Sequence, residues 1–240
     1  MSEWKPRKFW TKARAEAEDG GFTVLLDARR LMTPGKQPLT LPTRALADAI
    51  AAEWDAQAEL IEPETMPLTR AANSAIEKVA PQFDAVADML AAYGGTDLLC
   101  YRASAPADLV RRQAEAWDEW LAWARRDLGA DLRVTEGVIP IAQNPGALQR
   151  LRAELGRLDV FGLTALHDLV TLPGSLILGL AVLRGHLDAG AAFDLSRVDE
   201  DYQAEQWGRD AEAEASARAK RAAMESAARL WALSRPPQTP

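Results

Sequence analysis

The stretch Asp19-Gly-Gly-Phe-Thr-Val-Leu-Leu-Asp27 carries the clearest strand pattern in this chain. Its Asp-Gly-Gly start is typical of a tight turn, and the apolar and β-branched residues that follow favour a pleated surface. A second turn is expected at Thr33-Pro-Gly-Lys36, followed by a short extended segment at Pro38-Leu-Thr-Leu-Pro42. The N-terminal part of the chain therefore predicts hairpins in a small sheet.

Helical patterns begin directly after this part. Thr43 is a residue type that caps helices, and an apolar stripe through Ile50 and Trp54 follows at helical spacing. A second helix is expected over residues 68–79. Proline disfavours helical geometry in the residue before it and suits the first turn of a new helix. The expected domain boundary therefore lies at the Ala80-Pro81 step.

The rest of the chain predicts helices that are delimited by proline starts and glycine stops. The expected segments are Pro81 to Gly94, Pro106 to Gly129, Asn144 to Leu158, a pair over 161–187 interrupted near Pro173-Gly174, and one last helix from Asp199 to Leu233. The expected fold class is α+β, since strands come first and helices follow. We expect a small N-terminal mixed α/β domain with antiparallel strands over 1–80, a larger all-α helical domain over 81–235 and a disordered tail at 236–240.

Composition restricts the classes of partner. The chain has 240 residues, of which 48% are apolar, and a net charge of −7. Nucleic-acid binding depends largely on Lys and Arg that neutralise phosphates, so no nucleic-acid partner is expected. The most apolar run, Gly174–Leu183, is about half as long as the ~20 residues that a membrane span needs, so no stable membrane insertion is expected.

The same composition indicates a compartment. Cys100 is the only cysteine, which rules out an internal disulfide and suits a reducing environment. Residues 1–10 lack the apolar core of a secretory signal. We therefore expect a cytoplasmic protein, and nothing in the sequence requires more than a monomer.

Motifs for catalysis and cofactor binding are absent from the sequence. It has none of the glycine-rich phosphate-binding loops, and its histidines and cysteine lack zinc-ligand spacing, so no metal or other cofactor is expected. The alternative in the enzyme class is a small serine hydrolase that uses Ser175 and His167. The residues around Ser175 do not form the G-x-S-x-G nucleophile elbow. Because a hydrogen-bonded buried histidine is common, a structural role for both residues is favoured.

The most unusual stretch is the acidic and aromatic run Asp199-Glu-Asp-Tyr-Gln-Ala-Glu-Gln-Trp-Gly-Arg-Asp-Ala-Glu-Ala-Glu214, with seven carboxylates and one arginine. Tyr202, Gln203 and Trp207 fall inside it at helical spacing. Aromatic anchors in charged surroundings are typical of protein interfaces. Gly208 costs a helix ~1 kcal/mol relative to alanine, which indicates close backbone approach at that point. The alternative is that Trp207 docks the last helix onto its own domain.

Across its length the chain resembles a family of assembly chaperones. The blocks that carry the resemblance are Lys8-Phe-Trp10, Leu26-Asp-Ala-Arg-Arg-Leu-Met-Thr-Pro34, Leu41-Pro-Thr43, Ala52-Glu-Trp-Asp-Ala-Gln57, Met66-Pro-Leu-Thr-Arg-Ala-Ala-Asn73, Asp97-Leu-Leu-Cys-Tyr101, Gln113-Ala-Glu-Ala-Trp-Asp118, Leu172-Pro-Gly-Ser-Leu-Ile-Leu-Gly-Leu-Ala181 and Asp199-Glu-Asp-Tyr-Gln-Ala-Glu-Gln-Trp-Gly208. Their order and spacing are similar to those of the chaperones that escort the alpha subunit of the ATP synthase catalytic head in mitochondria and alphaproteobacteria.

The resemblance implies a two-domain chaperone without catalytic activity, which holds the unassembled alpha subunit until the beta subunit replaces it. The residues expected at the centre of the contact are Tyr202, Gln203, Trp207 and Gly208. The acids expected to steer a basic patch of the partner are Asp199, Glu200, Glu205 and Asp210. Trp54 is a further candidate, through inter-domain geometry. A structural subunit that stays in the finished complex is the remaining alternative.

Overall fold

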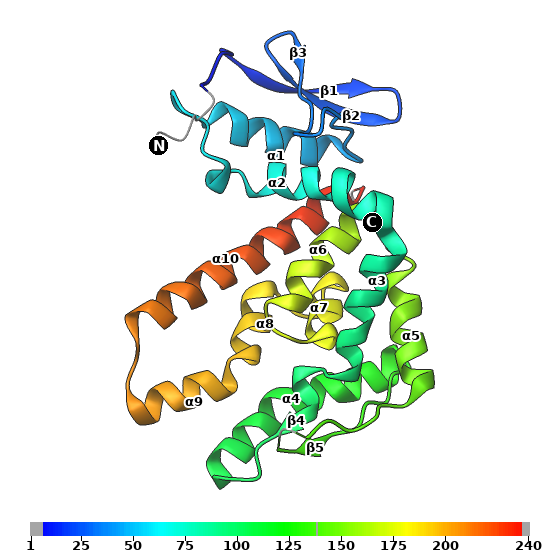
Figure 1. Cartoon of the computed structure of the whole chain (residues 1–240), viewed down its shortest axis with the longest axis vertical. Helices are drawn as coiled ribbons and strands as arrows, with labels where there is room; N and C mark the ends of the chain where they lie inside the picture. The colour runs from blue at the N-terminus through cyan, green and yellow to red at the C-terminus, as the bar shows by residue number, and fades with distance from the viewer. Residues whose placement is uncertain (1–6, 138, 237–240) are drawn as a thin grey trace. The chain divides into compact units, whose positions relative to one another are not determined.

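The computed structural model describes residues 7–137 and 139–236, which fold as two compact units (Figure 1). Unit 1 contains the described residues 7–82, 160–164 and 229–236. Unit 2 contains residues 83–159, apart from residue 138, and residues 165–228. Each unit therefore joins segments that are far apart in the sequence. Of the tail expected at 236–240, residues 237–240 lie outside the described residues.

Unit 1 is built on a three-stranded antiparallel sheet in the order β1-β2-β3. The strands are β1 (Ala13–Glu18), β2 (Gly21–Leu26) and β3 (Arg29–Arg30). The first two strands form the expected hairpin, in which Ala13 is opposite Leu26. Gly20, in the turn, has a φ of +87°, which residues with a side chain rarely adopt. The Asp-Gly-Gly signal therefore predicted the turn for the correct physical reason.

Helix α1 (Arg44–Asp55) packs on this sheet (Figure 1). Its first turn is closed by Thr43, whose Oγ1 accepts a hydrogen bond from Leu46 N at 3.1 Å, so the expected cap is confirmed. The Leu46 side chain is fully buried. The Thr43 hydroxyl also donates a hydrogen bond to the Leu233 carbonyl near the end of α10 (Ala211–Ser234). The start of α1 is thus tied to the C-terminal segment of the same unit.

The chain remains helical across the step at which a break was expected. The segments are a 3-10 turn at Pro63–Thr65, α2 (Pro67–Ser74), a π-helix at Ala75–Val79, a 3-10 turn at Ala80–Gln82 and α3 (Phe83–Ala91). The prediction that Pro81 opens a new helix was wrong by two residues. Pro81 lies inside the 3-10 turn, whose helical backbone suits the fixed φ of proline. Helix α3 begins after this turn, at Phe83.

Unit 2 is mostly helical. Its helices are α3, α4 (Ala107–Asp127), α5 (Pro145–Leu155), the C-terminal part of α6 (Val160–Thr171), α7 (Leu176–Leu183), α8 (Ala189–Ser196), α9 (Val198–Trp207) and the first part of α10, with 3-10 turns at Ala92–Gly95 and Leu98–Cys100. Every residue of α7 is buried, as expected for the most apolar run of the chain. Among the described residues, no helix combines the length and the apolar character that a membrane span requires.

The α+β class is confirmed, and unit 2 adds a pair of strands that the sequence does not predict. Strand β4 (Tyr101–Arg102) pairs in parallel with β5 (Thr135–Glu136). Each strand is too short to show the alternating pattern by which strands are recognised. Helix α8 was also missed, since its few turns of small residues carry little periodicity.

The single last helix expected from Asp199 to Leu233 is wrong, because the chain forms two helices there. Helix α9 ends at Trp207, and Gly208 then takes a φ of +96° and a ψ of 162°, which is not helical. Asp210 starts α10 instead, because its Oδ1 accepts a hydrogen bond from Ala213 N at 2.7 Å. The glycine and the capping aspartate together turn one apparent helix into two.

A buried carboxylate holds the start of α7. Asp97 is 0% exposed. Its Oδ2 accepts a hydrogen bond from Ile177 N at 3.0 Å, and its Oδ1 accepts one from Leu99 N at 3.1 Å. Ser175 caps the same helix, because its hydroxyl accepts a hydrogen bond from Leu178 N at 3.1 Å. Burial raises the pKa of Asp97 to about 6, and the hydrogen bonds to the carboxylate oppose that rise.

Replacing this carboxylate by Asp97→Ala should lower the free energy of unfolding by about 2–4 kcal/mol, because buried backbone N–H groups lose their acceptor. The measurement is chemical denaturation followed by circular dichroism. Asp131→Ala, at an exposed position of the same unit, is the matched control and should change stability by less than about 0.5 kcal/mol. Equal losses in the two variants would contradict the role of Asp97.

Asp97→Asn should change how stability depends on pH. Because the folded pKa lies above 3.8, the ordinary pKa of an aspartate, the favourable contribution of this carboxyl is complete below 3.8 and is lost as the pH rises through about 6. Asparagine does not titrate, so the variant should gain stability relative to the wild type between about pH 4 and pH 7. Denaturation midpoints across this range test the prediction, and parallel curves for the two proteins would refute it.

Candidate functional site

The residues of the acidic and aromatic run divide into two stripes on helix α9. Asp199, Tyr202 and Glu205 follow one another at intervals of three, and we refer to them as the inner stripe. Glu200, Gln203 and Trp207 follow at intervals of three and four, and we refer to them as the outer stripe. Residues at such spacings share a helix face, so the two stripes look in different directions. All three residues of the outer stripe are exposed, whereas Asp199 and Tyr202 are half-buried.

The inner stripe contacts helix α4 within unit 2. Gln113 Nε2 donates a hydrogen bond of 2.6 Å to Asp199 Oδ1. Arg112 Nη1 lies 3.0 Å from Glu205 Oε1 and 2.8 Å from Oε2. The Arg112 guanidinium also lies over the Tyr202 ring, 5.3 Å from its centroid. Every member of the inner stripe therefore has a partner on α4.

The two α4 residues are themselves held in place. Gln113 is 1% exposed, and its Oε1 accepts a hydrogen bond of 2.7 Å from Ala103 N. Arg112 Nε donates a hydrogen bond of 3.0 Å to Asp108 Oδ2, one turn earlier on α4. The hydrogen bond to Glu205 is the main cause that raises the pKa of Arg112, so this side chain stays charged.

The sequence did not identify Arg112 or Gln113 as site residues. The block Gln113-Ala-Glu-Ala-Trp-Asp118 carried part of the family resemblance, but nothing in it indicated a link to α9. The contact joins residues 93 positions apart. Local patterns cannot reveal such a pairing.

The outer stripe presents side chains that are free in the described structure. Trp207 is 80% exposed. Among residues 7–137 and 139–236, the side chains of Glu200, Gln203 and Trp207 make no hydrogen bond, ion pair or ring contact with the rest of the chain. The expectation that Trp207 could dock the last helix onto its own domain is therefore wrong. A large aromatic side chain that is exposed and unpartnered is the feature of this site most typical of a binding surface.

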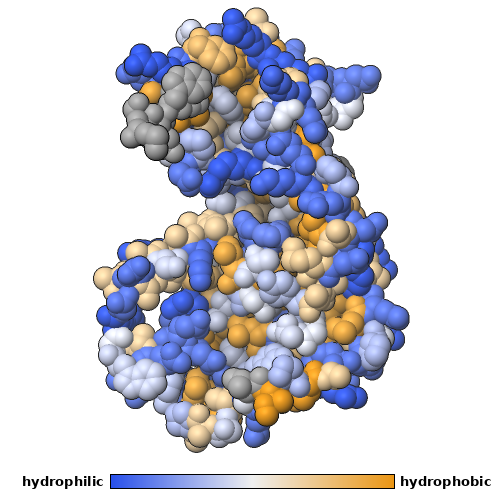
Figure 2. All heavy atoms as spheres, in the orientation of Figure 1, coloured by the Kyte–Doolittle hydropathy of each residue, from blue (hydrophilic) through white to orange (hydrophobic). Residues whose placement is uncertain are grey.

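The remaining residues of the run have structural roles that explain their type. No atom lies within 4 Å of the position that a Cβ on Gly208 would occupy, so the expected close backbone approach is wrong within this chain. Glycine suits the position because of its positive φ. Asp210 caps α10, as described above. Figure 2 shows hydrophilic residues mixed with paler, weakly apolar ones over the corner formed by α9 and the start of α10.

Trp54 lies in unit 1, within an aromatic cluster. Its ring centroid is 5.1 Å from that of Trp10, in an edge-to-face arrangement. Trp10 in turn contacts Phe9 at 5.2 Å, and Lys8 Nζ lies 5.5 Å from the Trp10 ring centroid. Trp54 is half-buried, and its indole Nε1 has no hydrogen-bond partner within the described part of the chain. This cluster accounts for the position of Trp54 by packing within unit 1.

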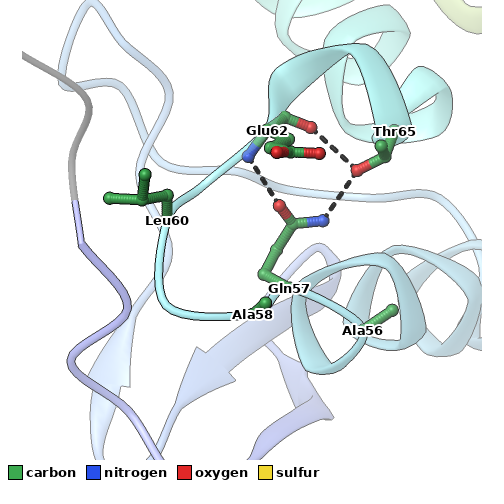
Figure 3. A pocket seen from close by; sticks show the side chains of 6 residues that line it. All are labelled: Ala56, Gln57, Ala58, Leu60, Glu62 and Thr65. Carbon is green, nitrogen blue, oxygen red and sulfur yellow. Dashed lines mark hydrogen bonds between the residues drawn. The ribbon is translucent and has the colours of Figure 1, made fainter.

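A pocket of about 220 Å³ lies at the end of α1 (Figure 3). Its lining residues are Ala56, Gln57, Ala58, Leu60, Glu62 and Thr65. The Gln57 side chain spans it, with Nε2 donating to Thr65 Oγ1 at 2.9 Å and Oε1 accepting from Glu62 N at 2.7 Å. Because the chain itself satisfies these polar groups, we assign the Gln57 side chain to closing the loop after α1 rather than to ligand binding.

The Ser175 and His167 pair does not have the geometry of a nucleophile and its base. Ser175 is 0% exposed and caps α7. His167 is exposed, and its Nδ1 lies 2.8 Å from Asp168 Oδ1, the hydrogen bond that raises its pKa. Within the described residues no hydrogen bond joins His167 to Ser175. Burial raises the pKa of the Cys100 thiol to about 12, so this thiol stays protonated at neutral pH.

The described residues were also searched for a possible metal site. The described part of the chain contains no group of three or more His, Cys, Asp or Glu side chains that could hold a metal ion. The acids of α9 point in several directions because they are consecutive on a helix.

Comparison with known proteins identifies the family. A model of the family described as ATP12 chaperone protein matches residues 7–125. The crystal structure of Atp12 from Paracoccus denitrificans is 65% identical in sequence and has a TM-score of 0.94, over 97% of this chain and 100% of that one. The chain belongs to the ATP12 chaperone family.

Two further relatives of this ATP12 family chaperone support the assignment. An aspartate-to-lysine variant of the Paracoccus denitrificans protein is 64% identical with a TM-score of 0.94, over 98% of this chain and 100% of the other. The mitochondrial protein atp12 of Schizosaccharomyces pombe is 26% identical over 214 residues, which are 84% of this chain and 74% of that protein. The matching family is described as a chaperone family, so the predicted class of function is confirmed at that level.

The exposure of Trp207 leads to a prediction about stability. Trp207→Ala should change the free energy of unfolding by less than about 0.5 kcal/mol, because its side chain is 80% exposed. Trp117→Ala should lower that free energy by about 3–5 kcal/mol, because a large buried side chain is removed. Trp117 is 0% exposed, and its Nε1 donates a hydrogen bond of 2.8 Å to the Leu195 carbonyl. Denaturation of both variants tests this contrast, and a large loss in Trp207→Ala would show that Trp207 packs within the protein.

Proposed function

We propose that this chaperone binds the unassembled alpha subunit of the ATP synthase catalytic head, prevents its aggregation and hands it to the beta subunit. Membership of the ATP12 chaperone family supports a role in ATP synthase assembly. In this proposal the protein acts as a cytoplasmic monomer. Its partner-binding face is the outer stripe of α9, with Trp207 as the anchor and Gly208 next to it.

The observation that carries the proposal is the exposure of Trp207. Burying an aromatic side chain of this size removes about 150–250 Å² from water, which is worth roughly 4–6 kcal/mol before ordering costs. The chain leaves this gain unused in the free state, since Trp207 is 80% exposed. Tryptophan is among the residue types that contribute most to protein interfaces. Glu200 and Gln203 lie beside it on the same helix face and supply a polar rim.

The charge around the outer stripe favours a basic partner surface. The segment 199–214 has seven carboxylates and one arginine. Glu200 and Glu212 form no ion pair among the described residues. Charges at the edge of an interface mainly raise the rate of association and set orientation. We therefore assign the steering of a basic patch to exposed acids such as Glu200, and the anchoring to Trp207.

A small interface with one aromatic anchor suits the task of a chaperone that must release its client. An unassembled subunit exposes an apolar interface that promotes aggregation. A chaperone has to cover part of that surface, and its binding has to be weaker than the contact between the two subunits. Trp54 remains a second candidate contact, separate from the α9 face.

The proposal predicts that the tagged protein captures the separately expressed alpha subunit and releases it when the beta subunit is added. Trp207→Ala should weaken capture of the alpha subunit by at least about tenfold, as expected for loss of an aromatic anchor. The measurement is a titration of the alpha subunit against each immobilised variant.

Ile139→Ala is the matched control, since Ile139 is 75% exposed, apolar and outside α9. It should change affinity by less than about twofold. A wild-type protein that fails to bind soluble alpha subunit would refute the proposed function. Presence of the protein in fixed ratio in the purified ATP synthase would support the structural-subunit alternative instead.

A further inference from the structure

Helix α9 has little apolar packing to hold it in place. None of its residues from Val198 to Trp207 is fully buried. A helix of this length is also marginal on its own in water. The position of the outer stripe must therefore depend on the contacts that the inner stripe makes with α4.

The neighbouring segment gives little support from the other side. The connection from Gly208 to Asp210 is exposed, and so are most residues of α10 from 211 to 220. The first strong attachment of α10 comes later, where Arg221 pairs with Asp194 of α8. The end of α9 that carries Trp207 is thus attached to the fold mainly through its own helix.

The contacts to α4 are arranged along the length of α9. Gln113 holds Asp199 in the first turn, and Arg112 holds Tyr202 and Glu205 in the next two turns. Because Gln113 is also bonded to Ala103 N and Arg112 to Asp108, both side chains have fixed directions. Two attachment points separated along a helix fix its rotation as well as its position.

We propose that Arg112 and Gln113 are positioning residues for the partner-binding face of α9, and that Asp199 and Glu205 act through them rather than by touching the partner. This inference rests on the proposed function and reassigns two of the acids that were expected from the sequence to steer a basic patch of the partner. Both Glu205 carboxylate oxygens are within 3.0 Å of Arg112 Nη1. A basic group of the partner would have to displace that guanidinium before it could use Glu205.

The first experiment measures the docking of α9 in the full-length free protein, without any partner. Arg112→Ala and Gln113→Ala should raise amide hydrogen exchange across residues 198–207 by about tenfold, whereas α4 and the buried helix α7 should keep wild-type exchange. Arg111→Ala is the matched control, because among the described residues Arg111 pairs with Asp108 and Glu115 on its own helix and with no residue of α9. Unchanged exchange in α9 in both variants would overturn the inference, whatever the partner proves to be.

The second experiment exchanges the charges of the ion pair and measures capture of the alpha subunit. Arg112→Glu and Glu205→Arg should each weaken capture by about fivefold to tenfold, and the double variant should return to within about threefold of the wild type. Arg112→Lys should fall between these limits, because lysine keeps the charge but has one nitrogen in place of the Nη1 that binds Glu205 and the Nε that binds Asp108. If the single variants weakened capture only by destabilising the fold, the double variant would not recover wild-type capture.

The outcomes separate the two proposals. A double variant as weak as Glu205→Arg alone would show that the Glu205 carboxylate contacts the partner, and would overturn the inference while leaving the proposed function intact. Failure of the wild-type protein to capture the alpha subunit would refute the proposed function, and the exchange measurement would still decide whether α4 positions α9.

Discussion

The buried carboxylate of Asp97 is the polar contact on which unit 2 depends. Helix α7 is buried at every position, so the N–H groups of its first turn cannot reach water. Asp97 and Ser175 satisfy two of these donors, Ile177 N and Leu178 N, from inside the core. Without them the helix of the most apolar segment could not begin inside the protein. Helices α4 and α8 and the 3-10 turn at Ala92–Gly95 contact α7.

Helix α9 follows the opposite principle. It has no buried residue, and its attachment to α4 is made by one amide, one guanidinium and one aromatic ring. Such contacts orient α9 on α4 but add little to the free energy of unfolding, since partly exposed ion pairs contribute little to it. The fold therefore separates two tasks. The buried apolar core around α7 provides stability. The polar contacts of α9 with α4 set the orientation of the exposed Trp207.

Much of this organisation could be predicted from local sequence signals. Three signals acted locally, each on the few residues next to it, and the structure contains all three. They are the Asp19-Gly-Gly21 turn, the Thr43 cap and the Asn144-Pro145 helix start. The acidic run with Trp207 was identified because its composition is unusual. Its division into two stripes was not, because Arg112 and Gln113 lie on a distant helix and no local period encodes that pairing. The prediction of a single helix over 199–233 was wrong because Gly208 adopts a positive φ, which ends the helix although the residues around it follow a helical pattern.

The composition of unit 1 has a consequence for how the protein is made. Its sheet and α1 come from the first residues of the chain, but the cap of α1 also bonds to the Leu233 carbonyl, and residues 229–236 belong to the same unit. During synthesis the ribosome produces the hairpin long before it produces those residues. Unit 1 therefore cannot complete its contacts until residues 229–236 have been translated, and a nascent chain that lacks them keeps part of the surface of unit 1 uncovered.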